Sequence, residues 1–310
     1  MSNRVTIVSL ADSKYFDLLN ELVDSIIVHP QSKEVSICIL DGGLEKKQIE
    51  ILEKKVYKIV VPKIDLQINR LGLEKKPYLQ GICARLFLRD IFPEFDKYIW
   101  IDSDAWVNSW VAIDHLLKGS ANGKLSIASM SDRHTGRVLK VKWFFRGAGV
   151  VKSQNYKHAI SSGYNLAISR KVGLEPHLNA GVFCLEKNSN FWDIWLKEFN
   201  FAVKKGRIFG SDQIAINIAV HILGQPVDIL PHYCNWIPYA VDNVCTNTLF
   251  SENTKLFVEK YTPNHPIGIM HLAGGIKIDN CDIRFDKYAK VKIYTTENKL
   301  IKKSLRFEYI

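Results

Sequence analysis

The sequence has no long apolar run. No stretch approaches about 18 consecutive apolar residues, so we expect no segment that spans a membrane. The first ten residues hold a short apolar run that passes directly into a strand pattern, which is not typical of a signal peptide. Six cysteines are present but none forms a Cys-x-x-Cys pair, so neither a zinc ribbon nor a thioredoxin-type motif is indicated. These absences predict a cytoplasmic protein with reduced thiols.

Linkers and repeats are missing as well. We find no internal repeat, no stretch rich in Pro, Gly and Ser, and no recognised nucleic-acid-binding motif. Hydrophobic residues make up 47% of the chain and charged residues 24%, which excludes wholesale disorder. The 310 residues therefore predict one large α/β domain over 1–280, followed by a short tail over 281–310.

The first 60 residues alternate between strand and helix patterns. Apolar strands are expected at 5–10, 35–40 and 58–61, with helices at 16–27 and 46–55 between them. This alternation predicts a mostly parallel sheet with right-handed crossovers, flanked by helices. Further strands are expected at 98–101, 124–129, 178–185 and 267–270, and further helices at 81–92, 110–118, 191–203 and from 210 onward.

Two carboxylates follow the most apolar of these strands. The segment from Tyr98 to Ile101 reads as a strand buried on both faces, and it runs into Asp102, Ser103 and Asp104. Ligands bind at the carboxyl ends of strands in such sheets, and oxygen ligands two residues apart suit Mg²⁺ or Mn²⁺. A solvated turn after the strand is the alternative.

Two later stretches place polar residues where a ligand could bind. Asn179 and Ala180 open the strand at 178–185, where small residues allow close approach to the backbone. Asp212 and Gln213 lie in the first turn of the helix from 210, where an acidic side chain is also favourable simply for the helix dipole.

A third motif follows the strand at 267–270. His271 precedes Gly274 by three residues and Lys277 by six. An imidazole suits a metal, glycine permits close backbone approach, and lysine neutralises phosphate charge. A structural histidine at a strand end is the alternative.

Residues 131–176 form a long excursion in which regular patterns dissolve. Before Ser161 this segment carries one acidic residue, Asp132, against many basic ones, among them Arg133, His134, Arg137, Lys140, Lys142, Arg146, Lys152 and Lys157. One interpretation is a solvated face. The other is a lid that orders over a bound donor and presents cations to an anionic acceptor.

Positive charge also gathers at the end of the chain. Seven Lys or Arg against two Glu give residues 287–310 a net charge of +5, interleaved with aromatic and aliphatic side chains. A terminal helix or edge strand packed on the domain is one interpretation. A tail lying on an anionic membrane, which would place the protein at its inner face, is a second. Nucleic-acid binding is a third.

Together these motifs resemble the family 8 glycosyltransferases, the retaining enzymes of glycogenin and lipopolysaccharide galactosyltransferase type. The likeness lies, in order, in Thr6 to Asp12 with Tyr15, in Asp102-Ser103-Asp104, in Asn179-Ala180-Gly181 with Asp212-Gln213, and in His271-x-x-Gly274-x-x-Lys277. One departure is visible: a Pro-Trp pair commonly follows that lysine in the family, and Ile278-Asp279 stands here.

The resemblance implies a GT-A (Rossmann-like) fold and transfer of a sugar from a UDP-sugar to an acceptor hydroxyl. It implies that Asp102, Asp104 and His271 hold Mn²⁺ or Mg²⁺, and that Gln213 and Asp212 are catalytic, with Gln213 nearest the anomeric carbon. It further implies donor contacts from Ala11, Asp12, Tyr15, Arg85, Asp102, Ser103, Asp104, Asn179, Ala180, Gly274 and Lys277. The expected acceptor is a glycan of a cell-surface polysaccharide or lipopolysaccharide.

Three other functions remain open at the sequence level. An inverting GT-A glycosyltransferase would place an Asp or Glu base beside the acceptor. A non-catalytic nucleotide-sugar-binding protein would bind donor without releasing nucleotide. A basic nucleic-acid-binding protein would lose affinity steeply with salt, but no nucleic-acid partner is expected because no such motif is present.

Overall fold

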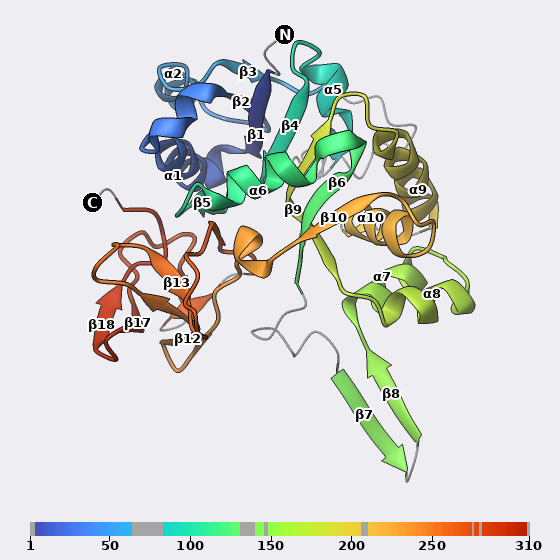
Figure 1. Cartoon of the computed structure of the whole chain (residues 1–310). Helices are drawn as coiled ribbons and strands as arrows, with labels where there is room; N and C mark the ends of the chain where they lie inside the picture. The colour runs from blue at the N-terminus through green and yellow to red at the C-terminus, as the bar shows by residue number, and fades with distance from the viewer. Residues whose placement is uncertain are drawn as a thin grey trace. The chain divides into compact units, whose positions relative to one another are not determined.

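The computed structural model describes residues 4–63, 83–130, 140–145, 148–205, 210–274, 276–278 and 281–308. These residues belong to two compact units. Figure 1 labels the helices and strands of both. Residues 4–61, 99–116 and 233–310 make up the unit that we call the terminal unit. Residues 62–98 and 117–232 belong to the other, which we call the middle unit.

The terminal unit contains the predicted parallel strands. The strands are β1 (Val5–Ala11), β2 (Val35–Asp41) and β3 (Lys58–Val60), and β1–β2 and β2–β3 pair in parallel. The end of β4 (Lys97–Ile101) lies beside β1, giving the order β4-β1-β2-β3. Helix α1 (Phe16–Ile27) connects β1 to β2, and α2 (Lys46–Leu52) connects β2 to β3. The alternation that the sequence predicted is therefore confirmed.

Helix α1 turns its apolar stripe inward. Leu19, Leu22, Val23 and Ile26 are buried, and the helix packs against β1 and β5 (Ala105–Val107). Ile27, the last residue of the helix, is 43% exposed. Burial of these side chains fixes α1 against β5, the strand that directly follows Asp104.

The basic tail is folded into a second sheet of the terminal unit. Strand β12 (Val244–Phe250) pairs with β11 (Ala240–Val241), β13 (Phe257–Glu259) and β17 (Val291–Thr295), and β18 (Leu300–Lys303) pairs with β17. Beyond β18, Trp106 Nε1 donates to the Leu305 carbonyl at 2.8 Å, and Arg306 Nε donates to Glu21 Oε2 at 2.9 Å. The strand pairing thus supports the packed edge-strand interpretation of residues 287–310.

The middle unit holds the remaining strands of the α/β fold. Its strand order is β10-β6-β9, from β10 (Val227–Leu230), β6 (Leu125–Ser129) and β9 (Leu178–Glu186). Strand β10 is parallel to β6, and β6 is antiparallel to β9. Helices α9 (Phe191–Lys205) and α10 (Ser211–His221) pack on each other, and α10 lies against β9 (Figure 1).

The expectation of little regular structure over 131–176 is wrong for most of that segment. Strands β7 (Lys140–Phe145) and β8 (Ala148–Lys152) form an antiparallel hairpin, and helices α7 (Gln154–Ser161) and α8 (Leu166–Gly173) follow. Both helices begin with a side-chain cap, from Ser153 and Asn165 respectively. Their apolar faces pack on α9 and α10 through Ala159, Tyr164, Val172, Ala202, Ile214 and Ile218. Residues 131–139 and 146–147 lie outside the described residues.

The other elements are short. They are η1 (Ser13–Tyr15), η2 (Pro30–Glu34), η3 (Arg85–Phe87), α5 (Leu88–Ile91), α6 (Val111–Gly119), η4 (Ala121–Gly123), η5 (His232–Asn235), β14 (Ile269–His271), β15 (Lys277–Ile278) and β16 (Cys281–Asp282). The helix predicted at 81–92 is seen as η3 and α5, with residues 81–82 outside the described part.

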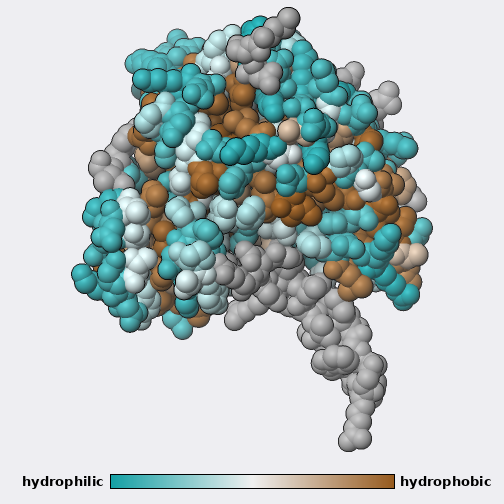
Figure 2. All heavy atoms as spheres, in the orientation of Figure 1, coloured by the Kyte–Doolittle hydropathy of each residue, from teal (hydrophilic) through white to brown (hydrophobic). Residues whose placement is uncertain are grey.

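The chain thus has the predicted α/β class, with mostly parallel strands flanked by helices. Its visible face mixes hydrophilic residues with scattered hydrophobic ones (Figure 2). No helix among the described residues is long and apolar enough to cross a membrane.

Candidate functional site

The two carboxylates lie in a tight turn between two buried strands of the terminal unit. Strand β4 is buried from Tyr98 to Ile101, and all of β5 is buried. The turn is closed by the Ala105 amide, which donates to the Asp102 carbonyl at 3.0 Å. Because the strands on both sides are fixed in the core, the carboxylates are held with little freedom to move.

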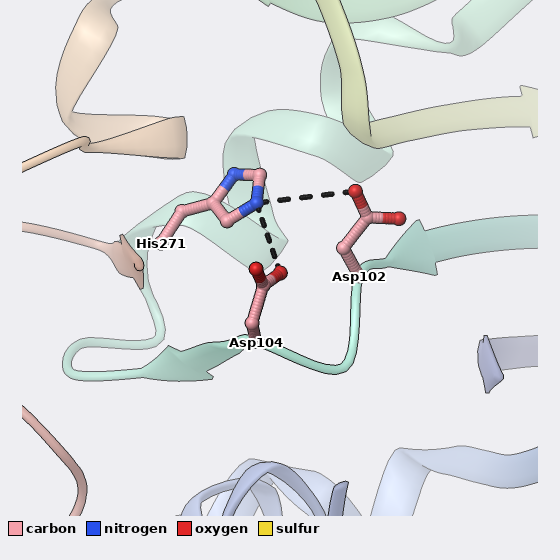
Figure 3. A group of neighbouring side chains, drawn as sticks. All are labelled: Asp102, Asp104 and His271. Atoms are coloured by element: carbon pink, nitrogen blue, oxygen red, sulfur yellow. Dashed lines mark ion pairs between the residues drawn. The ribbon is translucent and has the colours of Figure 1, made fainter. Parts of the chain in front are cut away.

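Strand pairing brings His271 to the same place. Strand β14 is antiparallel to β5, with His271 opposite Ala105, and the Leu272 amide donates to the Asp104 carbonyl at 2.8 Å. His271 Nε2 lies 3.2 Å from Asp104 Oδ1 and 3.9 Å from Asp102 Oδ2 (Figure 3). The sequence prediction that these three side chains form one group is therefore met in the structure.

Hydrogen bonds orient two of the three side chains. Trp100 Nε1 donates to Asp102 Oδ1 at 2.6 Å. His271 Nδ1 lies 2.8 Å from Oδ1 of Asn235, which is 1% exposed. An amide oxygen only accepts, so Nδ1 carries a hydrogen, and Nε2 is the nitrogen that faces the carboxylates. This is the arrangement found behind metal-binding histidines, whose second nitrogen usually donates to a fixed acceptor.

The donor set fits a divalent cation. One ligand atom from each of Asp102, Asp104 and His271 lies within 4.8 Å of the others, and no other such group occurs in the described part of the chain. Two carboxylates and one imidazole suit Mn²⁺ or Mg²⁺ and leave coordination positions for phosphate oxygens. Asp102, Asp104 and His271 therefore form a candidate metal site.

Arg284 also belongs to this site, and the sequence interpretation missed it. Its Nη1 lies 3.4 Å from Asp104 Oδ2 and 3.4 Å from the Tyr15 hydroxyl, and its Nη2 donates to Asp282 Oδ2 at 2.8 Å. Arg306 Nη1 donates to the Arg284 carbonyl at 3.1 Å, so the folded tail supports this position. Asp282 and Arg284 follow Lys277 closely in the sequence, but an acidic and a basic residue two positions apart do not by themselves indicate a site.

Arg284 and His271 shape the charge of Asp104. Burial by itself acts to raise the pKa of the Asp104 carboxyl. The hydrogen bond and charge of His271, together with the charge of Arg284, outweigh burial and hold that pKa below its ordinary value. Asp104 is therefore ionised at neutral pH, as a metal ligand must be.

The predicted nucleotide-contacting residues begin where β1 ends. Ala11 is the buried last residue of β1. Asp12 caps η1 by accepting from the amides of Lys14 and Tyr15 at 3.1 Å each. The Tyr15 ring meets Phe285 edge-on at 5.5 Å, and Arg284 joins its hydroxyl to Asp104. The structure thus connects Tyr15 with the metal-site carboxylates through one guanidinium.

Gly274 and Lys277 follow His271 in exposed positions. Gly274 has a φ of +78°, and a Cβ built there would meet no atom within 4 Å. Lys277 pairs with Asp282 at the start of the β15–β16 hairpin, which returns the chain to Arg284. Ser103 lies inside the turn and is 9% exposed. The structure does not place Lys277 in contact with the carboxylates.

A second group of predicted residues lies in the middle unit. Arg85 Nη1 donates to the Ala180 carbonyl at 2.8 Å and lies 3.5 Å from Asp212 Oδ2. Asp212 is 2% exposed, so its charge is compensated by Arg85. Asn179 accepts from the Gly181 amide at 2.7 Å and donates to the Met130 sulfur at 3.2 Å. Arg85 thus contacts both Ala180 and Asp212.

Gln213 is adjacent and has an unexpected partner. Its Oε1 atom lies 3.0 Å from Nε2 of His177, a buried residue that the sequence interpretation did not include. His177 directly precedes β9, so a pattern search centred on the strand would overlook it.

A comparison with family models identifies the class of protein. The model described as Glycosyl transferase family 8 matches residues 6–187, which is 182 of the 310 residues and more than half of the chain. The chain therefore belongs to glycosyl transferase family 8, and it is a glycosyltransferase. None of the curated proteins matches it.

One solved structure shares the fold at low sequence identity, and two others are less similar. The WbbM bifunctional glycosyltransferase in its apo form has a TM-score of 0.55 and 17% identity, covering 92% of this chain and 49% of its own. The chain thus spans about half the length of that protein. An active-site mutant of LgtC has a TM-score of 0.48 and 13% identity over 87% of each chain. GlyE of Streptococcus pneumoniae TIGR4 has a TM-score of 0.43 and 16% identity, covering 75% of this chain and 46% of its own.

Proposed function

We propose that this glycosyltransferase moves a sugar from a UDP-sugar donor to an acceptor hydroxyl in a metal-dependent, retaining reaction. The grouping of Asp102, Asp104 and His271 carries the proposal, since it provides a site for a cation that can accept phosphate oxygens. A divalent cation bound there would neutralise charge that develops on the diphosphate leaving group. The proposed acceptor is a glycan of a cell-surface polysaccharide or lipopolysaccharide.

In the terminal unit, the chain's own residues hold the nucleotide. Tyr15 and Asp12 contact the base, and Lys277 adds positive charge toward the diphosphate. Arg284 lies between Tyr15 and Asp104 and would contact the ribose or diphosphate when Asp104 turns to the metal. A UDP-sugar is proposed over GDP- and CMP-sugars because the β1–η1 segment resembles the uridine-binding start of the family.

In the middle unit, Asn179, Asp212 and Gln213 act on the sugar. Asp212 is compensated by Arg85 and buried, so it is poorly suited to act as a free base. Gln213 carries no charge and can stabilise the anomeric carbon through its dipole. Retention follows if the leaving phosphate itself takes the acceptor proton. NMR analysis of the product anomer separates this route from inversion.

Metal dependence tests the proposal. Excess chelator should abolish both donor hydrolysis and transfer, and Mn²⁺ should restore them. Asp104→Asn should lower kcat by orders of magnitude with little change in melting temperature, because the turn is held by backbone hydrogen bonds. Asp114→Asn removes an exposed carboxylate of α6 in the same unit and serves as the matched control. Full activity in excess chelator would refute metal dependence, and donor binding without nucleotide release would favour a non-catalytic binding protein.

The identity of the donor is tested by measuring the melting temperature of the protein with UDP-, GDP- or dTDP-sugars in the presence of Mn²⁺. A ligand at 100 times its Kd adds about 2.7 kcal/mol to the free energy of unfolding. UDP compounds should raise the melting temperature most. A shift with GDP and none with UDP would overturn the donor assignment.

Two peripheral roles remain proposals. The segment 131–176, of which residues 131–139 and 146–147 lie outside the described part, is proposed to act as a lid over the donor, and hydrogen exchange across 131–160 with and without UDP and Mn²⁺ tests this. The basic strands β17 and β18 are proposed to touch an anionic membrane surface from the cytoplasm. Sedimentation with anionic vesicles should then weaken as salt is raised.

A further inference from the structure

His177 lies between two side-chain amides in the middle unit. It is 2% exposed; its Nδ1 lies 2.6 Å from Asn155 Oδ1 of α7, and its Nε2 lies 3.0 Å from Gln213 Oε1 of α10. In this arrangement both ring nitrogens face an amide oxygen, yet a neutral imidazole has only one N–H to donate. One of the two amides must therefore present its nitrogen instead, since amide oxygen and nitrogen are equivalent in shape.

The surroundings of Asn155 decide which amide turns. Asn155 Nδ2 donates to the Glu175 carbonyl at 3.2 Å. Turning this amide would set its oxygen against that carbonyl and lose the hydrogen bond. Asn155 Oδ1 therefore faces His177 and accepts from Nδ1–H. The proton of the imidazole is thus fixed on Nδ1.

The imidazole is neutral, so its other nitrogen cannot donate. Burial lowers the pKa of His177 to about 4. The nearby imidazoles of His158 in α7 and His221 in α10 also lower it, because a charge on either would repel a charge on His177. The carboxylate of Glu175 lies 3.8 Å from His221 and partners that ring. Nε2 of His177 therefore carries a lone pair and needs a donor, which is the amide nitrogen of Gln213.

The frame around this contact is rigid. Asn217 of α10 donates to the Leu178 carbonyl at 3.1 Å and accepts from the Leu178 amide at 3.0 Å. It also donates to the Gln213 carbonyl at 2.8 Å. The residue after His177 and the first turn of α10 are thus held together by one buried side chain. These hydrogen bonds fix the distance between His177 and Gln213. The main remaining freedom is which end of the Gln213 side-chain amide, oxygen or nitrogen, faces the imidazole.

We propose that His177 is a positioning residue that fixes the Gln213 side-chain amide with its nitrogen toward the imidazole and its Oε1 toward the donor sugar. The chain of donors runs from Asn155 to Glu175, from His177 to Asn155 and from Gln213 to His177. The remaining end of Gln213 hydrogen-bonds no described residue and carries partial negative charge. An oxygen there suits the positive charge that develops at an anomeric carbon. The inference rests on the proposed role of Gln213.

The tautomer is tested directly by ¹⁵N NMR of the histidine-labelled full chain, with His177 assigned by the signals lost in His177→Asn. We expect a protonated Nδ1 and an unprotonated Nε2 across about pH 5 to 8. An Nε2–H tautomer, or a doubly protonated ring in this range, would overturn the inference. This measurement needs no activity and uses the native protein.

The functional consequence is tested by a double-mutant cycle. Asparagine at 177 reproduces the Nδ1 position and keeps the bond to Asn155, but it leaves Gln213 without its partner. His177→Asn should lower kcat roughly tenfold or more with little change in donor KM, and His177→Gln should restore part of it. In a Gln213→Ala background, His177→Asn should cause no further loss.

The outcomes separate the two proposals. An equal loss from His177→Asn with and without Gln213 would show that His177 acts independently and would refute the positioning role. Unchanged kcat in Gln213→Ala would instead remove the catalytic role of Gln213, whatever tautomer the NMR shows.

Discussion

Replacing Asn235 by Ala should weaken metal binding while leaving the fold nearly intact. The Asn235 side chain is buried, and its Oδ1 accepts from His271 Nδ1–H at 2.8 Å. Its Nδ2 is buried without a hydrogen-bond partner among the described residues. Truncation therefore removes one useful hydrogen bond and one unsatisfied donor, two effects that oppose each other in the free energy of unfolding.

The effect on metal affinity has no such compensation. Without Asn235, His271 loses the acceptor that keeps its lone pair on Nε2, and the ring is free to rotate or change tautomer. Removing such an outer partner typically weakens metal binding by about 10- to 100-fold, or about 1.4–2.7 kcal/mol. We expect Asn235→Ala to weaken Mn²⁺ binding within this range.

The assay is a titration of the metal-free protein with Mn²⁺, followed by the EPR signal of the free ion. Asn247→Ala is the matched control, because Asn247 is another buried asparagine of the terminal unit whose amide bonds the Tyr239 nitrogen and the Ile237 carbonyl. The control should lower thermal stability but not Mn²⁺ affinity. Equal Mn²⁺ affinities of Asn235→Ala and the native chain would refute the orienting role of Asn235.

Three further predictions concern other positions. Arg284→Ala should raise the KM for the donor in steady-state kinetics. Arg284→Lys should give an intermediate KM, because lysine keeps the positive charge but lacks the paired N–H donors of the guanidinium. Equal KM values in the variants and the native protein would show that Arg284 does not contact the donor. The free energy of unfolding should rise with pH between about 4 and 6.5, because His177 binds a proton in the unfolded state but not in the folded one. The lowering of the His177 pKa from 6.5 to about 4 corresponds to about 3 kcal/mol of this free energy. Denaturant unfolding of His177→Asn should therefore show a flatter pH profile. Arg306→Ala should destabilise the terminal unit in the same assay by leaving the Glu21 carboxylate without its partner, and an unchanged midpoint would show that this ion pair adds nothing to stability.

The sequence was most informative where one local pattern decided the outcome. Strand β4 was recognisable because an unbroken apolar run is needed for a strand buried on both faces, and the carboxylates after it stood out against that background. His271 could be named from its spacing to Gly274 and Lys277, although its pairing with Ala105 was invisible before folding.

Residues that depend on distant partners could not be recognised in advance. Arg284 belongs to the candidate site because it contacts Tyr15 and Asp104, which are remote from it in the sequence. His177 is important because it contacts side-chain amides on two different helices. The helices α7 and α8 were missed because their polar faces dominate their composition, and only packing on α9 and α10 shows which few apolar positions form a core.

The interleaved chain path has a consequence for how the protein is made. The terminal unit is assembled from residues 4–61, 99–116 and 233–310, whereas the middle unit ends at residue 232. During synthesis the middle unit can therefore close first, while β1, β2 and the carboxylate turn wait for β14 and the last strands. Pairing of β5 with β14 joins Asp104 to a histidine 167 positions later (271 minus 104), a long-range closure that slows folding. A ribosome stalled before residue 271 would carry a chain with both carboxylates but without the imidazole of the candidate metal site, and without strands β17 and β18 of the terminal unit.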